Sequence, residues 1–221
     1  MHLALISAFT LLHPSLQAPI YNGIILEIYT CSTAGRSTYD KNVYVKSVYR
    51  LLGRKEMLIR KAIPSDAETI HRIVQNTVKE IYPNYYPREV VDFFLNYHSP
   101  EIISSDIAKG NVYLIQDRGE YIATGGIYQD NYISRLYVLP GHQGKGYGSA
   151  LMELLEKNLS EVYDTALLEA SLPSYDYYLK LGYQPKEYQK YEVENHRILC
   201  YYIMEKQLRR ISEGSLEMNQ R

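Results

Sequence analysis

A glycine-rich segment near the middle of the chain is the clearest candidate for chemistry. It reads Gln143-Gly144-Lys145-Gly146-Tyr147-Gly148 and lies between a predicted strand, 132–138, and a predicted amphipathic helix. Glycines at this spacing leave backbone N–H groups exposed at a helix N-terminus, where the helix dipole also favours negative charge. The segment is therefore expected to bind a phosphate or pyrophosphate group.

The spacing of these glycines differs from the two common nucleotide motifs. A dinucleotide fingerprint needs G-x-G-x-x-G, and a Walker loop needs Gly-Lys-Ser/Thr after four spacer residues. A glycine-rich turn can also be only a tight connection, but the strand before it and the helix after it favour an anion site. A protein that binds nucleotide phosphates on another α/β scaffold stays an open alternative.

The elements that would position this loop begin at Met57. A strand is expected there, then a helix opened by the capping box Ser65-Asp66-Ala67-Glu68, a second helix after Pro87, and a short third helix within 99–108. Three strands follow within 112–138. Their compact polar connections are typical of antiparallel hairpins.

After the glycines, the pattern predicts an amphipathic helix, a buried strand over 166–170, a helix over 174–181 that Gly182 stops, and a closing strand over 198–204. A Rossmann chain would alternate strand and helix from its start. We therefore predict a mixed α/β fold with a largely antiparallel central sheet flanked by helices.

Composition narrows the class of protein. The chain has 221 residues, of which 46% are hydrophobic and 22% charged, with a formal net charge of −1. This charge argues against a nucleic-acid partner, and no apolar run is long enough to span a membrane. Two cysteines, Cys31 and Cys200, cannot form a disulfide framework and indicate a reducing compartment, so we expect a cytoplasmic protein.

The chain divides into a leader of uncertain status (1–56), a domain (57–206) and a polar C-terminal tail (207–221). An apolar run in the leader allows a signal peptide, but no Lys or Arg precedes it and no small-x-small cleavage pattern follows it. The favoured expectation is therefore a gene-start error, with Met57 as the true first residue, and a poorly ordered extension is the other.

Two motifs resemble those of one family, the GCN5-related N-acetyltransferases. The family signature Gln/Arg-x-x-Gly-x-Gly/Ala is matched at Gln143, Gly146 and Gly148. Downstream, Tyr177-Tyr178-Leu179-Lys180-Leu181-Gly182-Tyr183 resembles the family segment aromatic-Tyr-x-x-x-Gly-Phe/Tyr. The resemblance covers about 57–206. It implies the acyl-CoA N-acyltransferase fold, acetyl-CoA as cosubstrate, no metal, and transfer of an acetyl group to a primary amine of a small molecule or protein by a monomer or homodimer.

The resemblance also implies roles for individual residues. The backbone of Leu136, Tyr137 and Val138 would pair with the pantetheine arm of the cosubstrate, and the amide near Val138 would polarise the acetyl carbonyl. The remaining cosubstrate-binding candidates, which include the pyrophosphate loop, are Gln143, Gly144, Lys145, Gly146, Tyr147, Gly148 and Ser171.

The resemblance implies that Tyr178 is the general acid. The chain holds 24 tyrosines, however, so a tyrosine at any one position can match by chance. Glu169 is a candidate base at the end of a strand, and Glu80, His98 and His142 are others. Ser171 and Ser174 stand where the family often has Asn and Ala. This departure keeps open a noncatalytic CoA-binding sensor or regulatory module on the same fold.

Overall fold

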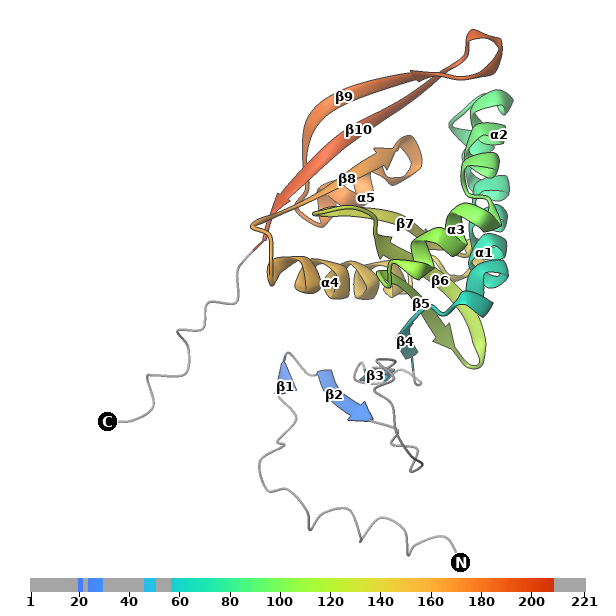
Figure 1. Ribbon diagram of the computed structural model, residues 1–221. Helices are drawn as coiled ribbons and strands as arrows, with labels where there is room; N and C mark the ends of the chain where they lie inside the picture. Colours follow the sequence, from blue (N-terminus) through green and yellow to red (C-terminus); the bar gives the residue numbers. More distant parts are fainter. Residues whose placement is uncertain (1–19, 22–23, 30–45, 51–56, 209–221) are drawn as a thin grey trace, which may run out of the picture.

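The computed structural model describes residues 20–21, 24–29, 46–50 and 57–208, with side chains for 57–208. Its strands form one sheet in the order β1-β2-β3-β4-β5-β6-β7-β8-β10-β9 (Figure 1). Every neighbouring pair is antiparallel except β7 and β8, which are parallel. The strands are β1 (Ile20–Tyr21), β2 (Ile24–Tyr29), β3 (Lys46–Arg50), β4 (Met57–Lys61), β5 (Val112–Asp117), β6 (Glu120–Ile127), β7 (Tyr132–Val138), β8 (Thr165–Ser171), β9 (Gln184–Glu192) and β10 (Ile198–Gln207).

Five α-helices flank the described sheet. They are α1 (Ala67–Ile81), α2 (Arg88–Tyr97), α3 (Pro100–Ala108), α4 (Tyr147–Ser160) and α5 (Tyr175–Lys180). The core has two parts, because α1 to α3 cover one face of the sheet and α4 and α5 the other. Side chains of β5 alternate between these parts, with Val112 and Leu114 in one and Tyr113 and Ile115 in the other. The predicted mixed sheet flanked by helices is confirmed.

The strands β7 and β8 part soon after they meet. Their pairing consists of Tyr132 with Leu167 and Ile133 with Leu168. The remainder of β7 stays paired to β6 on its other side, up to Val138 opposite Ala123. The sheet therefore opens along the second half of β7, directly before the glycine-rich loop.

A β-bulge lies at the start of this opening. Gly126 is opposite Ser134, but Thr124 is opposite Tyr137, so β7 carries one extra residue. Arg135 in the bulge has a φ of 53°, in the left-handed region that a side chain other than glycine's rarely adopts. The bulge changes which backbone groups of β7 face the opening.

The predicted capping box at Ser65 is wrong. A 3₁₀ turn, Pro64–Asp66, precedes α1, and no side chain caps the helix itself. The side chain of Asp66 instead accepts from the backbone N–H of Ile63 at 2.8 Å and from the Arg60 guanidinium at 2.6 Å. A charged partner on the adjacent strand is a stronger donor than a helix amide, and no pattern in 65–68 reveals it.

The sequence pattern missed β9. This strand pairs only with β10 and forms one edge of the sheet, and all but one of its residues are exposed. With both faces in water, its sequence lacks the alternation of apolar and polar residues that marks a half-buried strand.

The predicted leader and tail are described only in part. The backbone of β3 pairs with β4, with Ser47 opposite Ile59. The other residues of 1–56 apart from β1 and β2, and the tail from 209 onward, lie outside the described residues. The leader, the position of the true first residue and the tail stay predictions.

Candidate functional site

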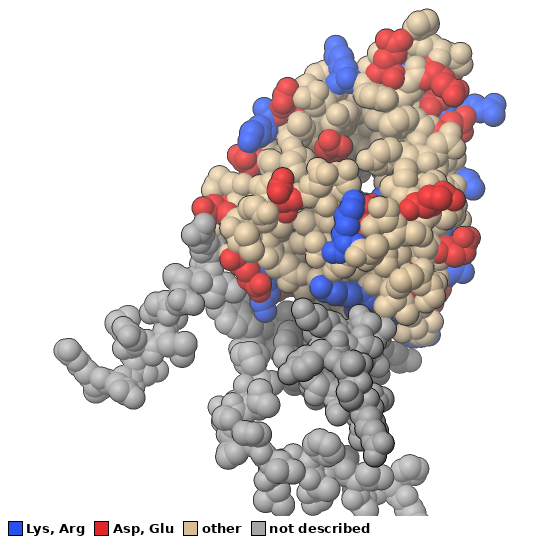
Figure 2. Space-filling view, in the orientation of Figure 1, with Lys and Arg blue, Asp and Glu red and all other residues tan. Residues whose placement is uncertain are grey.

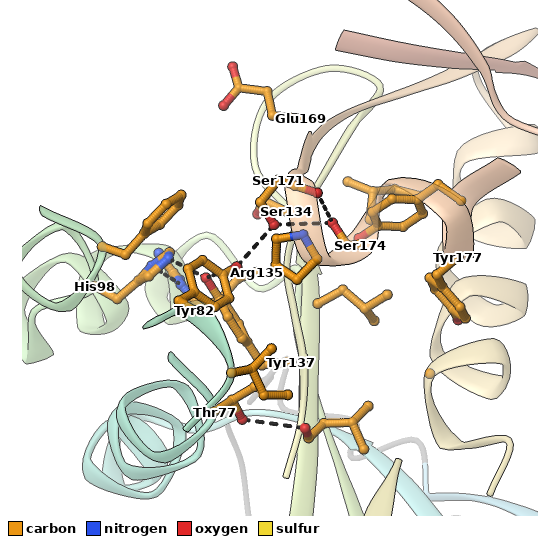
Figure 3. A pocket seen from close by; sticks show the side chains of 18 of the residues that line it. Thr77, Tyr82, His98, Ser134, Arg135, Tyr137, Glu169, Ser171, Ser174 and Tyr177 are labelled. Atoms are coloured by element: carbon orange, nitrogen blue, oxygen red, sulfur yellow. Dashed lines mark hydrogen bonds between the residues drawn. The ribbon is translucent and has the colours of Figure 1, made fainter. Parts of the chain in front are cut away.

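A cavity of about 820 Å³ opens where β7 and β8 part. Residues from β7, the glycine-rich loop, β8, α2 and α5 line it, and Figure 3 shows several of them around the opening. The predicted site residues that line it are Leu136, Tyr137, Val138, Gln143, Gly144, Gly146, Tyr147, Gly148, Glu169, Ser171 and Tyr178. Lys145 is the exception.

The loop ends in a helix N-terminus with no side-chain cap. Gly146 is the N-cap of α4 with a φ of 88°, and Gly144 has a φ of 72°. Both values lie in the region that glycine adopts without strain. The first turn of α4 therefore offers backbone N–H groups to an anion, together with the positive end of the helix dipole.

Hydrogen bonds fix the end of β7 relative to this loop. The Gln143 side-chain amide donates to the Val138 carbonyl at 3.0 Å, and the Thr77 hydroxyl donates to the same oxygen at 3.3 Å. The Leu139 N–H donates to Ile122 on β6 at 2.9 Å. Because successive residues of a strand alternate in direction, the Val138 N–H points away from β6 and toward the opening.

Two side chains of the loop turn to other partners. The Lys145 ammonium donates to the carbonyl of Gly141 at 2.8 Å, within the loop. The Tyr147 hydroxyl donates to Asp117 at 2.7 Å, while its ring lines the cavity. The backbone of the loop, rather than the Lys145 side chain, is what the cavity presents.

The two sequence motifs meet in space at Gly148. A Cβ atom on this residue would lie 2.9 Å from the Tyr177 hydroxyl on α5, which is closer than real Cβ contacts. Gly148 thus lets the Tyr177 side chain of α5 pack closely against the first turn of α4. This contact sets the glycine loop beside the helix that carries Tyr178.

Tyr178 is a buried residue of α5 whose side chain lines the cavity. Burial raises its pKa well above the ordinary value, with smaller contributions from Tyr177 and Tyr82. The phenol therefore stays protonated at neutral pH, as a proton donor must. Within the described residues, it stands outside the side-chain hydrogen bonds that join Tyr82 and Tyr137.

A chain of polar side chains crosses the floor of the cavity (Figure 3). The Tyr137 hydroxyl lies 2.9 Å from His98 Nε2 and 3.4 Å from the Tyr82 hydroxyl. The Tyr82 hydroxyl lies 3.1 Å from that of Ser171, which lies 3.1 Å from that of Ser174. The two serines that replace the expected Asn and Ala are therefore bonded to each other, and Ser171 to Tyr82 as well.

A buried ion pair, which the sequence did not predict, holds the other end of this row of polar side chains. The buried Arg135 guanidinium donates to Asp106 of α3 at 2.8 Å and to His98 Nδ1 at 3.3 Å. Burial, and then the positive charge of Arg135, lowers the pKa of His98 to about 3, so its imidazole is neutral. With Nδ1 accepting from Arg135, the ring proton lies on Nε2, and His98 is poorly suited to act as a base. No local pattern signals a contact between α3 and the bulge.

Glu169 lies on β8 with its side chain exposed at the cavity. The residues packed around this carboxyl exclude part of its water, which raises the pKa of Glu169. Figure 3 shows it apart from the bonded serines and tyrosines. Of the other candidate bases, His142 lines this cavity, whereas Glu80 lines a separate, shallower one.

Among the described residues, no group of three or more His, Cys, Asp or Glu side chains could hold a metal ion. Within the same ranges, the helices are too short or too polar to cross a membrane.

Several solved structures that share this fold are acetyltransferases by name. A GCN5-related N-acetyltransferase from Rhodopseudomonas palustris superposes with a TM-score of 0.62, at 21% identity over 68% of this chain and 94% of its own. The PaiA N-acetyltransferase from Thermoplasma acidophilum, in complex with coenzyme A, gives 0.56 at 19% identity over 69% and 99%. The acetyltransferase YncA from Salmonella typhimurium, with acetyl-CoA, gives 0.51 at 20% identity over 70% and 95%.

A search of curated proteins found no significant match. The family model described as the acetyltransferase (GNAT) domain matches residues 81–207, which is more than half of the chain. This range includes the opening between β7 and β8, the glycine-rich loop and Tyr178. The chain therefore belongs to the GCN5-related N-acetyltransferase (GNAT) family.

Proposed function

We propose that this protein transfers the acetyl group of acetyl-CoA directly to a primary amine. The observation that carries the proposal is the cavity of about 820 Å³ at the opening between β7 and β8, which is lined both by uncapped helix amides and by the buried Tyr178. Structures with this fold have been solved with coenzyme A and with acetyl-CoA. A cytoplasmic location is part of the proposal and rests on the sparse use of cysteine.

The residues present fit the donor. The first-turn amides of α4 and the backbone of Gly144 would hold the pyrophosphate, since they face the cavity without a side-chain cap. The unpaired edge of β7 over Leu136 to Val138 offers backbone groups to the amides of the pantetheine arm. When bound, acetyl-CoA supplies a thioester whose carbonyl carbon an amine can attack.

Two groups of this chain would lower the barrier. The Val138 N–H points into the opening and can donate to the carbonyl oxygen as negative charge develops there. Tyr178 can give its proton to the departing sulfur. In the transfer the C–N bond forms and the C–S bond breaks, the thiolate takes the Tyr178 proton, and the amine gives up one proton. Water at the cavity mouth would return a proton to Tyr178.

Glu169 as the base that takes the proton from the amine stays a prediction. It lies two residues along β8 from Ser171, roughly 7 Å away at ordinary strand rise. Glu169→Gln tests this role.

The proposal is tested by incubating the full chain with acetyl-CoA and a panel of polyamines, amino acids, aminoglycosides and peptides. We expect release of free CoA thiol in step with a gain of one acetyl mass on an acceptor. Stoichiometric CoA binding with no thiol release across the panel would support the noncatalytic module instead. Competition by ATP that exceeds that of CoA would contradict both readings.

The noncatalytic alternative has one specific observation in its favour. Ser171 stands where the family often has Asn, and its hydroxyl is occupied by Tyr82 and Ser174. A group that the family often uses to hold the donor is thus committed within the protein. The thiol-release measurement separates the two functions directly.

A further inference from the structure

The part of the cavity away from the glycine loop is walled by aromatic rings. They come from separate parts of the chain and are Tyr85, Phe93, Tyr97, Tyr128, Tyr191 and Tyr201. Four of them are unusually exposed for tyrosines: Tyr85 and Tyr97 are each 51% accessible, Tyr128 43% and Tyr191 52%. The Phe93 ring of α2 lies 5.2 Å from the Tyr191 ring of β9, so the wall closes across the two sides.

The charges that line the cavity are unevenly matched. Within the described residues, the acidic and basic side chains of the lining are Asp106, Arg135 and Glu169, besides His142 and the neutral His98. Asp106 pairs with Arg135 at 2.8 Å and also with Lys109 at 3.0 Å. Glu169 makes no ion pair with a described residue, so among the acids of the described lining it is the one without a cation partner. On the face shown in Figure 2, by contrast, acidic and basic side chains are interspersed.

Such a wall favours a cation. The faces of aromatic rings attract ammonium groups, and a carboxylate beside them adds a charged hydrogen bond. One of these rings already has a cation against it, since the Lys109 ammonium lies 4.9 Å from the centre of the Tyr128 ring. The same chemistry is available around Glu169 to a molecule that enters the cavity.

The position of Glu169 sets the distance to the reacting end. Glu169 and Ser171 lie on the same face of β8, roughly 7 Å apart at ordinary strand rise. Ser171 is bonded to Tyr82, and both residues line the same cavity as Tyr178, the proposed acid. A charged group of the acceptor that binds Glu169 would therefore be separated from the reacting nitrogen by only a few carbon atoms.

We propose that the acceptor is a small amine with a second positive charge, and that Glu169 and the tyrosine wall bind that second charge while the other nitrogen reacts. The inference rests on the proposed function and names its substrate class. It gives Glu169 a binding role in place of the role of base. The two roles differ in what happens to an acceptor that has only one nitrogen.

The test compares 1,4-diaminobutane with butylamine, which is similar in length and lacks the second ammonium. We expect kcat/KM in the wild type to be at least about tenfold higher for the diamine. Glu169→Gln should remove most of this preference, because it should lower kcat/KM for the diamine far more than kcat/KM for butylamine. Glu153→Gln, an exposed substitution on α4, is the matched control and should change neither value.

A second readout does not depend on turnover. Calorimetric titration of 1,4-diaminobutane into the protein without acetyl-CoA should show binding that weakens about tenfold in Glu169→Gln and stays unchanged in Glu153→Gln. If no amine is acetylated but this difference holds, the proposed function fails and the cation site stands. An equal fall in kcat/KM for both amines in Glu169→Gln would overturn the inference and would indicate that Glu169 acts as a base. A wild type without preference for the diamine in either measurement would also overturn it.

Discussion

Burial decides the protonation state of the side chains nearest the opening between β7 and β8. It raises the pKa of Tyr178 and that of Tyr137, and it lowers the pKa of His98 to about 3. The site therefore presents neutral phenols and a neutral imidazole at physiological pH. Of these groups, Tyr178 combines a cavity position with a hydroxyl outside the network, which makes it the best placed proton donor.

Replacing Tyr178 by Phe removes this proton and leaves the ring. We expect kcat to fall roughly 10²-fold, the usual scale for a general acid, with the affinity for acetyl-CoA nearly unchanged. Tyr175→Phe is the control, because Tyr175 is on the same helix but its ring packs on Tyr202, 4.9 Å away. Steady-state kinetics with a responsive amine measure both. Wild-type turnover in Tyr178→Phe would remove this residue from the mechanism.

The buried His98 should make stability depend on pH. An unfolded histidine takes up its proton near pH 6.5, whereas folded His98 does so only near pH 3. The unfolded chain binds more protons between these values, so the free energy of unfolding should fall as the pH drops from about 6.5 toward about 3. His98→Gln can still accept from Arg135 and donate to Tyr137 but does not titrate.

Chemical denaturation at a series of pH values compares the two proteins. The fall in unfolding free energy from pH 6.5 to pH 4 should be smaller in His98→Gln than in the wild type. Parallel curves would show that His98 is not buried as a neutral group.

At the scale of elements, the start of α4 depends on α5. A Cβ atom at Gly148 would lie 2.9 Å from the Tyr177 hydroxyl, so any other residue there forces the Tyr177 side chain or the start of α4 to shift. Because the first turn of α4 carries the anion-binding amides, a shift of this helix moves the proposed pyrophosphate site. The glycine that belongs to one motif is required by an aromatic residue of the other.

Gly148→Ala should therefore lower both the stability of the protein and its affinity for CoA, and a second substitution at Tyr177 should partly restore them. Overpacking of this kind costs about 1–3 kcal/mol of stability, and we expect CoA affinity to fall by roughly tenfold. Adding Tyr177→Phe removes the oxygen at 2.9 Å and leaves the nearest ring carbon at 3.5 Å, an ordinary contact. Thermal unfolding and calorimetric CoA titration should both recover in the double variant. No recovery would mean that Gly148 serves the ligand rather than the helix contact.

The spacing of apolar residues in the sequence predicts helices and strands that bury one face, but it does not predict those that bury neither. The buried residues Ile70, Ile73 and Val74 recur at helical spacing, so α1 was predictable, as was the hairpin of β5 and β6 from its short polar turn. β9 is exposed on both faces and left no such pattern. The ion pair of Asp106 with Arg135 joins α3 to a bulge in β7, and only the folded chain shows that these residues meet.

For the whole molecule, β7 is a strand that, like β5, contributes side chains to both halves of the core. Tyr137 packs with α1 and α2 on one face, while Leu136 and Val138 pack with the cluster that includes α4 on the other. Its side chains thus hold the two layers together, and its backbone is left unpaired at the opening. This division lets one strand serve the core and a ligand at the same time.

The central claim is that acetyl-CoA lies in the opening between β7 and β8, with its pyrophosphate on the loop before α4. Amide hydrogen–deuterium exchange with and without CoA tests this most directly, because it reports where backbone N–H groups become protected. We predict slower exchange in peptides that cover 134–148 and no comparable change in the β9 and β10 hairpin. Protection confined to other segments, or none at saturating CoA, would contradict the account.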